Sequence, residues 1–555
     1  MISVRTFLGK GDADVQAALD GWRTKFPRLW AKDKSLWTNA DEDKWLGWLD
    51  IVAREQRDLP SLEAFAQEVK SLSDVVLIGM GGSSLGSEVL AQSFGPQPGF
   101  PRFHALDSTS PDQIEALEAK LDLAKTLFIV ASKSGSTLEP NILKDHFFAR
   151  VNKAGRQFAA ITDPGSSMEK EAKEKSYAHI FYGEPSIGGR YSVLSRFGLV
   201  PGAAMGIDIA WLLNATGEAV TRCKNGDDLE NNPGAMLGLA IGVLATKHGR
   251  DKITISASPA LESVGGWLEQ LIAESTGKIG KGLIPVDLEP LAAPAFYGAD
   301  RVFVHVAIAG DPEPAKLKAL ENAGQPVIRI TLDEVYELGQ LFFVSEIAVA
   351  IAGAMLGINP FNQPDVEASK VKSRALTQEY ESSGKLPAGE PIRRFDGMAL
   401  YADARNAKVL EGCNTLAEVL RAHFRQAKAG DYIGLLAFIE QSAPHRASLQ
   451  AMRTKLRDTL KVATCAEFGP RFLHSTGQAY KGGPNSGIFL TLTAKPKRDM
   501  QLANGKMSFG VVQEAQAIGD FEVLNERGRR ALRLHLDDLQ GGLIALGKAL
   551  DAALA

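Results

Sequence analysis

The sequence lacks the features of several common protein classes. Its 62 Lys and Arg residues are outnumbered by 66 Asp and Glu residues, so no surplus of positive charge is available to bind a nucleic-acid backbone. The few cysteines, Cys223, Cys413 and Cys465, are scattered without CxxC spacing. This pattern argues against a disulfide framework or a zinc site and fits a reducing cytoplasm. We therefore expect a cytoplasmic protein that binds no nucleic acid and no metal.

Membrane-targeting features are missing as well. The N-terminal sequence MISVRTFLGKGDADVQ has no apolar signal core. No later segment keeps the roughly 20 uncharged apolar residues that a membrane span requires, so we expect no membrane association. What the sequence does have is length: 555 residues, 45% of them hydrophobic, are too many for one core and predict about three domains.

The stretch ASKSGSTLEP, residues 131–140, follows an apolar run over 127–130 and precedes a helical pattern. Its hydroxyl side chains would stand where free N–H groups and the positive end of a helix dipole face an anion. These side chains are Ser132, Ser134, Ser136 and Thr137. The Walker pattern GxxxxGK[ST] is absent, so a sugar monophosphate suits the loop better than a nucleoside triphosphate. An ordinary serine-capped helix start is the alternative.

A second loop of this kind, GMGGSSLG over residues 79–86, follows an apolar run over 75–78. Its glycines allow positive φ and close backbone approach, and Ser83 and Ser84 stand at the head of the next helix. Further apolar runs over 103–106 and 158–162 alternate with helical patterns. This alternation predicts a doubly wound parallel sheet, in which ligands bind at the carboxyl ends of the strands. Both hydroxyl loops lie there.

Two charged residues stand out beside these loops. Arg190 follows two glycines in IGGRYS, where an exposed turn arginine is the alternative to a functional one. Glu274 lies in the helical segment IAESTGK, and its expected apolar surroundings would raise its pKa towards that of a general base. A solvated glutamate at a helix end is the alternative.

The composition pattern divides the chain into four parts. Residues 1–70 read as an N-terminal helical flank with several tryptophans, 71–225 as a first sheet domain and 226–384 as a second. Residues 385–555 form their own α/β pattern behind a Gly- and Pro-bearing linker over 382–394. This last part holds RFLHSTGQAYKGGP, residues 471–484, which concentrates His474, Gln478 and Lys481. A structural turn cluster is the alternative to a functional segment there.

Five motifs, taken in order, resemble the phosphoglucose isomerase family: IGMGGSSLG, SKSGSTLEP, GGRYSVL, ESTGK and NPFNQPDVEASK. They cover about residues 45–375. The resemblance implies tandem sugar isomerase domains of flavodoxin-like topology, followed here by a C-terminal α/β domain. The activity it implies is a cofactor-free and metal-free aldose-ketose isomerisation of glucose 6-phosphate and fructose 6-phosphate through an enediol.

The resemblance also assigns roles to residues. It implies Glu274 as the catalytic base, Arg190 as the enediolate stabiliser, and Gln363 and Lys370 as substrate or ring-opening contacts. The residues it implies around the phosphate are Gly82, Ser83, Ser132, Lys133, Ser134 and Thr137. Family members carry a ring-opening histidine, often supplied by a partner subunit, downstream of the glutamate motif. The corresponding residues 296–303 hold none, and His305 beside them is expected to be a packed or solvated strand residue.

The C-terminal part resembles the tail of the isomerase half in fused transaldolase-phosphoglucose isomerase proteins; transaldolase activity is not expected. We hypothesise that it folds over the cleft and brings His474, with Lys481 nearby, to the place of the missing histidine. The alternative is that His474 caps a turn and Lys370 opens the ring unaided. Activity on mannose 6-phosphate as well, or a sensing module without catalysis, are alternative functions. A homodimer and a monomer are both open.

Overall fold

The first sheet is entirely parallel. The computed structural model describes residues 1–387 and 389–555, and its first sheet has the order β3-β2-β4-β5-β6. These strands are β2 Asp74–Ile78, β3 Arg102–Leu106, β4 Thr126–Ala131, β5 Phe158–Thr162 and β6 His179–Tyr182. Every residue of β2 and β4 is buried, because helices cover both faces of the sheet. In chain order the arrangement is 2-1-3-4-5, the flavodoxin-like order that the family resemblance implied.

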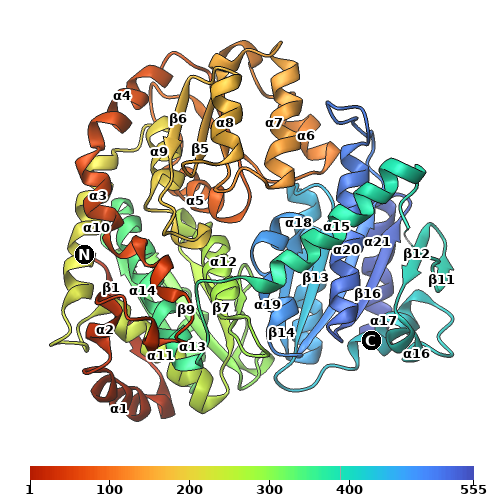
Figure 1. Ribbon diagram of the computed structural model, residues 1–555. Helices are drawn as coiled ribbons and strands as arrows, with labels where there is room; N and C mark the ends of the chain where they lie inside the picture. Colours follow the sequence, from red (N-terminus) through yellow and green to blue (C-terminus); the bar gives the residue numbers. More distant parts are fainter. Residues whose placement is uncertain (388) are drawn as a thin grey trace.

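Helices cover this sheet and join it to the N-terminal flank (Figure 1). Those within and after the sheet are α5 Leu85–Phe94, α6 Pro111–Glu118, α7 Leu138–Arg150, α8 Ser167–Glu174, α9 Arg196–Ala204 and α10 Ile209–Lys224. Those of the flank are α1 Asp12–Trp22, α2 Phe26–Trp30, α3 Ile51–Arg57 and α4 Leu59–Val69.

The parallel strands of the second sheet have the same order as those of the first, and a strand from the N-terminus pairs with its edge. Its order is β1-β10-β9-β7-β8, with β7 Lys252–Ala257, β8 Ile284–Val286, β9 Arg301–Ile308 and β10 Val327–Leu332 parallel. Strand β1, Ser3–Phe7, pairs antiparallel with β10 at the end of the sheet. The sequence predicted only helix in this flank. A five-residue edge strand has a weak apolar pattern, and its partner lies far along the chain.

The helices of this second part are α11 Pro233–His248, α12 Val264–Thr276, α13 Ala315–Asn322, α14 Leu338–Leu356 and α15 Pro364–Ser383. Within the described residues, the segment Val335–Leu356 is the one long and apolar enough to cross a membrane by length and composition. However, 89% of its apolar window is buried inside the protein, where α14 packs against α10, α11 and α12. This burial is typical of a core helix.

A third sheet confirms the predicted C-terminal α/β domain. Its order is β14-β13-β15-β16-β12-β11, with β11 Arg393–Phe395, β12 Met398–Tyr401, β13 Tyr432–Phe438, β14 Ala463–Phe468, β15 Gly487–Ala494 and β16 Arg530–Leu536. Its parallel strands again follow the order 2-1-3-4. Its helices are α16 Ala404–Lys408, α17 Leu416–Phe424, α18 Ala443–Leu460, α19 Gly477–Gly482, α20 Phe509–Glu526 and α21 Leu539–Leu554.

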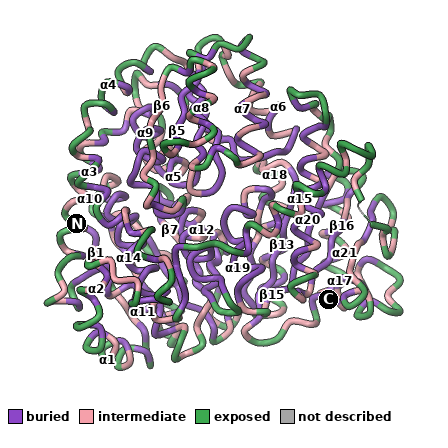
Figure 2. The backbone as a smooth tube through the Cα atoms, viewed as in Figure 1, coloured by how far each residue is buried: buried purple, intermediate pink, exposed green. Residues whose placement is uncertain are grey.

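The third domain packs against both others. Strand β14 lies against β8 at the edge of the second sheet. The segment after β15 reaches the first domain, where Leu502, Met507 and Phe509 share a hydrophobic cluster with Phe147 of α7. Buried residues of the two domains therefore share one cluster. Figure 2 shows that buried positions are concentrated in the central strands and helices. The domain boundaries drawn from the sequence remain predictions, and residue 388 of the predicted linker lies outside the described residues.

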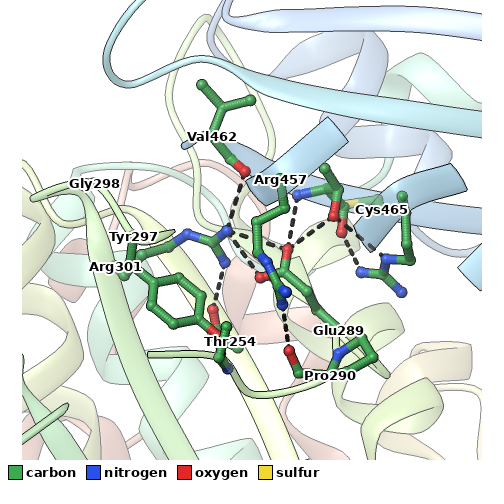
Figure 3. Close-up of polar contacts among 12 residues, drawn as sticks. Thr254, Glu289, Pro290, Tyr297, Gly298, Arg301, Arg457, Val462 and Cys465 are labelled. Atoms are coloured by element: carbon green, nitrogen blue, oxygen red, sulfur yellow. Dashed lines mark hydrogen bonds and ion pairs between the residues drawn. The ribbon is translucent and has the colours of Figure 1, made fainter. Parts of the chain in front are cut away.

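A buried polar network joins the edges of the second and third sheets (Figure 3). Arg301 pairs with Glu289 at 2.9 Å, and both side chains are 0% exposed. The other oxygen of Glu289 accepts hydrogen bonds from the backbone N and Oγ1 of Thr464 on β14, at 3.1 and 2.9 Å. Burial opposes the charge of Glu289, but Arg301 and Arg453 outweigh it and hold the pKa of the carboxyl below its usual range. We call Glu289, Arg301 and Thr464 the docking lock.

The docking lock predicts a large loss of stability when one charge is removed. Glu289→Met leaves the guanidinium of Arg301 buried without its partner, which costs about 3–5 kcal/mol of the free energy of unfolding. Urea denaturation followed by circular dichroism measures it. The matched control is Glu174→Met, which removes an exposed ion pair with Lys170 and should change little. Equal unfolding midpoints for Glu289→Met and the wild type would show that the lock contributes no stability.

Candidate functional site

The cavity at the switch point of the first sheet is the candidate site. It has a volume of about 500 Å³ and opens at the carboxyl ends of β2 and β4. Residues of all three domains line it. All but one of the predicted site residues are among them: Gly82, Ser83, Ser132, Lys133, Ser134, Thr137, Glu274, Gln363, Lys370 and His474. The exception is Arg190, which lies just behind the wall and contacts Glu274 and Gln363.

The hydroxyl loop after β4 has the geometry of an anion cup. Thr137 is the N-cap of α7 but makes no side-chain capping bond, so its hydroxyl and the first amides of α7 stay available. Ser132 Oγ accepts a hydrogen bond from Gly135 N at 3.2 Å, and the hydroxyls of Ser134 and Ser136 lie 2.8 Å apart. Gly135 has φ +72°, and a Cβ there would come within 2.5 Å of Met168 N. The turn therefore requires glycine.

The glycine loop after β2 brings the second wall of the cavity close. A Cβ on Gly82 would lie 2.0 Å from the carbonyl oxygen of Gly189. Only glycine permits this approach, which places Ser83 beside the turn that carries Arg190. Lys133 also lines the cavity, but its ammonium already pairs with Asp163 at 2.5 Å and donates to the carbonyl of Pro185 at 3.0 Å.

Glu274 lies near the C-terminal end of α12 and is 8% exposed. The sequence pattern predicted apolar surroundings for its carboxylate, and that expectation is wrong. Gln270 Nε2 donates to Glu274 Oε2 at 3.1 Å, and Arg190 Nη1 lies 3.5 Å from Oε1. Gln270 lies one helical turn before Glu274, so its place beside the carboxylate follows from the sequence. Arg190 comes from another domain, so its place does not. Both groups fix the orientation of the carboxylate.

Arg190 is not an exposed turn residue, because it is only 2% exposed. Its Nε donates to Ser275 Oγ at 2.7 Å, its Nη1 to Gln363 Oε1 at 3.0 Å and its Nη2 to Asn362 O at 3.1 Å. The guanidinium thus ties the helix of Glu274 to the N-cap of α15, the helix that carries Lys370.

His474 reaches the cavity from the third domain. It ends a short 3-10 helix, Arg471–His474, which follows β14. Its Nε2 lies 2.9 Å from Glu139 Oε1, and its carbonyl accepts from Gln270 Nε2 at 2.9 Å. The same Gln270 thus touches both His474 and Glu274. The structure brings His474 to the cavity, as the sequence hypothesis expected.

Glu139 is the functional candidate that sequence reasoning missed. It is the glutamate of SKSGSTLEP and lies in the first turn of α7, where the helix dipole favours an acid whatever its function. Burial alone would raise the pKa of the Glu139 carboxyl. The nearby His474 and Lys370 lower this pKa by more than burial raises it, so the pKa lies below its usual value. Gln516 Nε2 also donates to Glu139 Oε1 at 2.7 Å. A buried acid in a phosphate loop is the signal that could have revealed it.

Lys481 and His305 are the two other residues for which the sequence raised an expectation near the missing histidine. Lys481 does not line the cavity: it is buried in an ion pair with Asp520 at 2.6 Å, so the expectation of Lys481 beside the substrate is wrong. His305 lies within β9, 3% exposed, and its Nδ1 is 3.0 Å from Ser256 Oγ. Residues 296–303, which lack the family histidine, contact the third domain instead. The guanidinium groups of Arg301 and Arg457 lie 5.2 and 5.6 Å from the centroid of the Tyr297 ring.

Metal ligation has no candidate in the described residues, where no three His, Cys, Asp or Glu side chains are grouped to hold an ion.

The fold and cavity define a sugar-isomerase type of protein: two parallel-sheet domains, an anion cup at the switch point, and buried acid and imidazole groups facing it.

Comparisons with known proteins agree with this class. The family model for phosphoglucose isomerase matches residues 57–289. Glucose-6-phosphate isomerase of Symbiobacterium thermophilum is 32% identical over 386 residues, 60% of this chain and 86% of that one. The enzyme of Methanocaldococcus jannaschii is 30% identical over 367 residues, 59% of this chain and 88% of that one. The chain belongs to the glucose-6-phosphate isomerase family.

Solved structures support the fold. A hypothetical protein from Thermus thermophilus is 26% identical with a TM-score of 0.58, covering 67% of this chain and 99% of that one. A glucose-6-phosphate isomerase from Chlamydia trachomatis is 19% identical with a TM-score of 0.55, covering 70% of this chain and 89% of that one. At such identity the second likeness concerns the fold alone.

The anion cup predicts weaker phosphate binding when its hydroxyls are removed. Ser132→Ala and Thr137→Ala each lose a hydrogen bond to a charged group, worth about 1.5–3 kcal/mol, or roughly 10-fold or more in the inhibition constant of inorganic phosphate. Competition in an isomerase assay measures it. Thr221→Ala, on the exposed face of α10, is the matched control. Unchanged inhibition constants in both cup variants would place the phosphate elsewhere.

Proposed function

We propose that this protein interconverts glucose 6-phosphate and fructose 6-phosphate by an aldose-ketose isomerisation that needs no metal. The observation that carries the proposal is that an anion cup, the buried carboxylate of Glu274 and the imidazole of His474 line one cavity, and Glu139 pairs with that imidazole. Membership of the glucose-6-phosphate isomerase family supports the choice of sugar.

Substrate binding starts with the phosphate. The hydroxyls of Ser83, Ser132, Ser134 and Thr137, with the first amides of α7, surround the anion at the positive end of the helix. The sugar then extends from the first sheet towards α12 and α15. Gln363 and Lys370 on α15 contact its hydroxyls, so the ring lies between the two sheet domains.

Ring opening is the step of His474. Glu139 is ionised and can only accept, so His474 Nε2 carries the proton between them at 2.9 Å. Nδ1 is then free to exchange a proton with the ring oxygen, for which imidazole has a suitable pKa range. Glu139 holds the orientation of the imidazole ring. Lys370 adds positive charge on the same side.

Isomerisation is the step of Glu274. Its carboxylate takes the proton from C2 of the open aldose and returns it to C1, while negative charge develops on the enediolate oxygens and the hydroxyl proton of O2 passes to O1. Gln270 and Arg190 keep the carboxylate in one orientation. The fixed positive charge of Arg190 stabilises the enediolate through the cavity wall.

One chain supplies all of these groups, since His474 comes from the third domain and no second copy is needed to complete the cavity. This arrangement supports activity of a single chain. Activity on mannose 6-phosphate and a cytoplasmic location remain predictions.

The base assignment predicts that Glu274→Gln abolishes turnover while substrate binding persists. The amide keeps the shape and its contact with Gln270 but cannot accept the proton, so kcat falls by about 100-fold or more, the contribution of general base catalysis. Stopped assays and calorimetric titration of fructose 6-phosphate measure the two quantities. Glu218→Gln, an exposed substitution on α10, is the control. Full activity of Glu274→Gln would reject the assignment.

The ring-opening assignment predicts that His474→Ala slows conversion of the cyclic sugar far more than that of an analogue lacking the ring-closing hydroxyl. Glu139→Gln should shift the same ratio in the same direction, because it removes the charge that orients the imidazole. Rates on both substrates measure the ratio. If both variants lose equal activity on both substrates, or none, His474 has a structural role and Lys370 is left as the ring-opening group.

A further inference from the structure

Gln478 is the polar residue of the segment HSTGQAYKGGP that the proposed reaction leaves without a role. It lies in α19 of the third domain, one turn after His474, and is 0% exposed. It does not line the cavity. A fully buried amide is costly unless all of its hydrogen bonds are made, so its contacts indicate what it holds in place.

Every donor and acceptor of the Gln478 amide is used. Oε1 accepts from the backbone N of Asp365 at 2.9 Å and of Val366 at 3.1 Å. Nε2 donates to the carbonyl of Gly277 and to Asp365 Oδ2, both at 2.9 Å. An amide has two donor hydrogens and an oxygen that accepts twice, so no capacity is left over. The pattern also fixes the orientation of the amide, because a flip would oppose donor to donor.

The partners of Gln478 are the ends of the two helices that carry the reacting groups. Asp365 and Val366 belong to the first turn of α15, whose amides have no partner within the helix. Gln363, the N-cap of α15, makes no side-chain capping bond, so Gln478 acts as the cap from another domain. Gly277 directly follows α12, three residues after Glu274.

The backbone around this amide is packed too closely to adjust. A Cβ on Gly277 would lie 2.3 Å from Ala479 Cα, and a Cβ on Gly482 would lie 2.3 Å from Asp365 Oδ2. The backbone N of Gly280 also donates to the carbonyl of Gly482 at 2.9 Å. Segments of the second and third domains are therefore in contact on both sides of Gln478, and its amide sets their spacing.

We propose that Gln478 is a positioning residue for the isomerisation: it fixes the start of α15, with Gln363 and Lys370, relative to the end of α12, with Glu274, and to His474. The inference rests on the proposed function. Gln478 touches neither the anion cup nor the reacting atoms, so it acts on the geometry of the groups that do. Misplacement by about 1 Å can cost about 100-fold in rate.

The test is Gln478→Met, which keeps the length and apolar stem but loses all four hydrogen bonds. We expect kcat for fructose 6-phosphate to fall by about 10- to 100-fold. The inhibition constant of inorganic phosphate should stay unchanged, since the anion cup belongs to the first domain. Gln340→Met is the matched control, because Gln340 is also 0% exposed but bonds the N-terminal strand through Ile2 N. This control should lose stability and keep its kcat.

A second pair of variants tests the hydrogen bond itself. In Gln478→Glu a carboxylate oxygen faces both the Asp365 carboxylate and the Gly277 carbonyl, so kcat should fall as in Gln478→Met. Adding Asp365→Asn restores a donor opposite an acceptor, and the double variant should recover part of kcat. Circular dichroism and the melting temperature confirm that each variant is folded at the assay temperature.

The outcomes separate the two proposals. Wild-type kcat in folded Gln478→Met overturns the positioning role, as does an equal loss of kcat in Gln340→Met. An absence of recovery in the double variant also counts against it. If the wild-type protein does not interconvert the two sugar phosphates, the proposed function fails, whatever the Gln478 variants do.

Discussion

The edge of the third sheet lies against the edge of the second, and the buried pair of Glu289 and Arg301 bonds across it to Thr464 and to the carbonyl of Val462. Both charges are taken out of water, and Thr464 of β14 satisfies the remaining oxygen of the carboxylate. Compared with apolar side chains of similar volume, such a buried pair adds little to the free energy of unfolding. Its hydrogen bonds to β14 form in only one relative position of the two sheet edges, so it specifies how the sheets dock. Because β14 leads directly to His474, the pair also sets where the imidazole lies.

The three sheets share the strand order 2-1-3-4, and the domain of each contributes different groups to the cavity. The first supplies two hydroxyl loops at its switch point, where ligands of such sheets bind. The second supplies Glu274 and, after its last core helix, α15. The third adds no strand to the cavity but closes it, bringing His474 from one side and packing Phe509 against the first domain from the other.

Polar groups around the cavity are shared rather than duplicated. Gln270 touches both Glu274 and the carbonyl of His474, and Arg190 touches both Glu274 and Gln363. Glu139 belongs to the phosphate loop and yet orients the imidazole. This sharing links the hydroxyl loop, the imidazole of His474 and the carboxylate of Glu274 through fixed hydrogen bonds among buried side chains.

The sequence by itself determined most strands of the first sheet and the hydroxyl loops, and it predicted Glu274 as the base, because apolar runs, glycines and the segment ESTGK are local signals. It did not determine which residues would meet. Strand β1 pairs with β10, Arg190 flanks a carboxylate expected among apolar residues, Lys481 is buried against Asp520, and Glu139 finds His474 335 positions away. The contacts of β1, Arg190 and Glu139 join different parts of the chain, whereas Lys481 and Asp520 meet within the third domain. Tertiary packing brings all of these partners together, and for Glu139 and His474 it is the docking of the third sheet that does so.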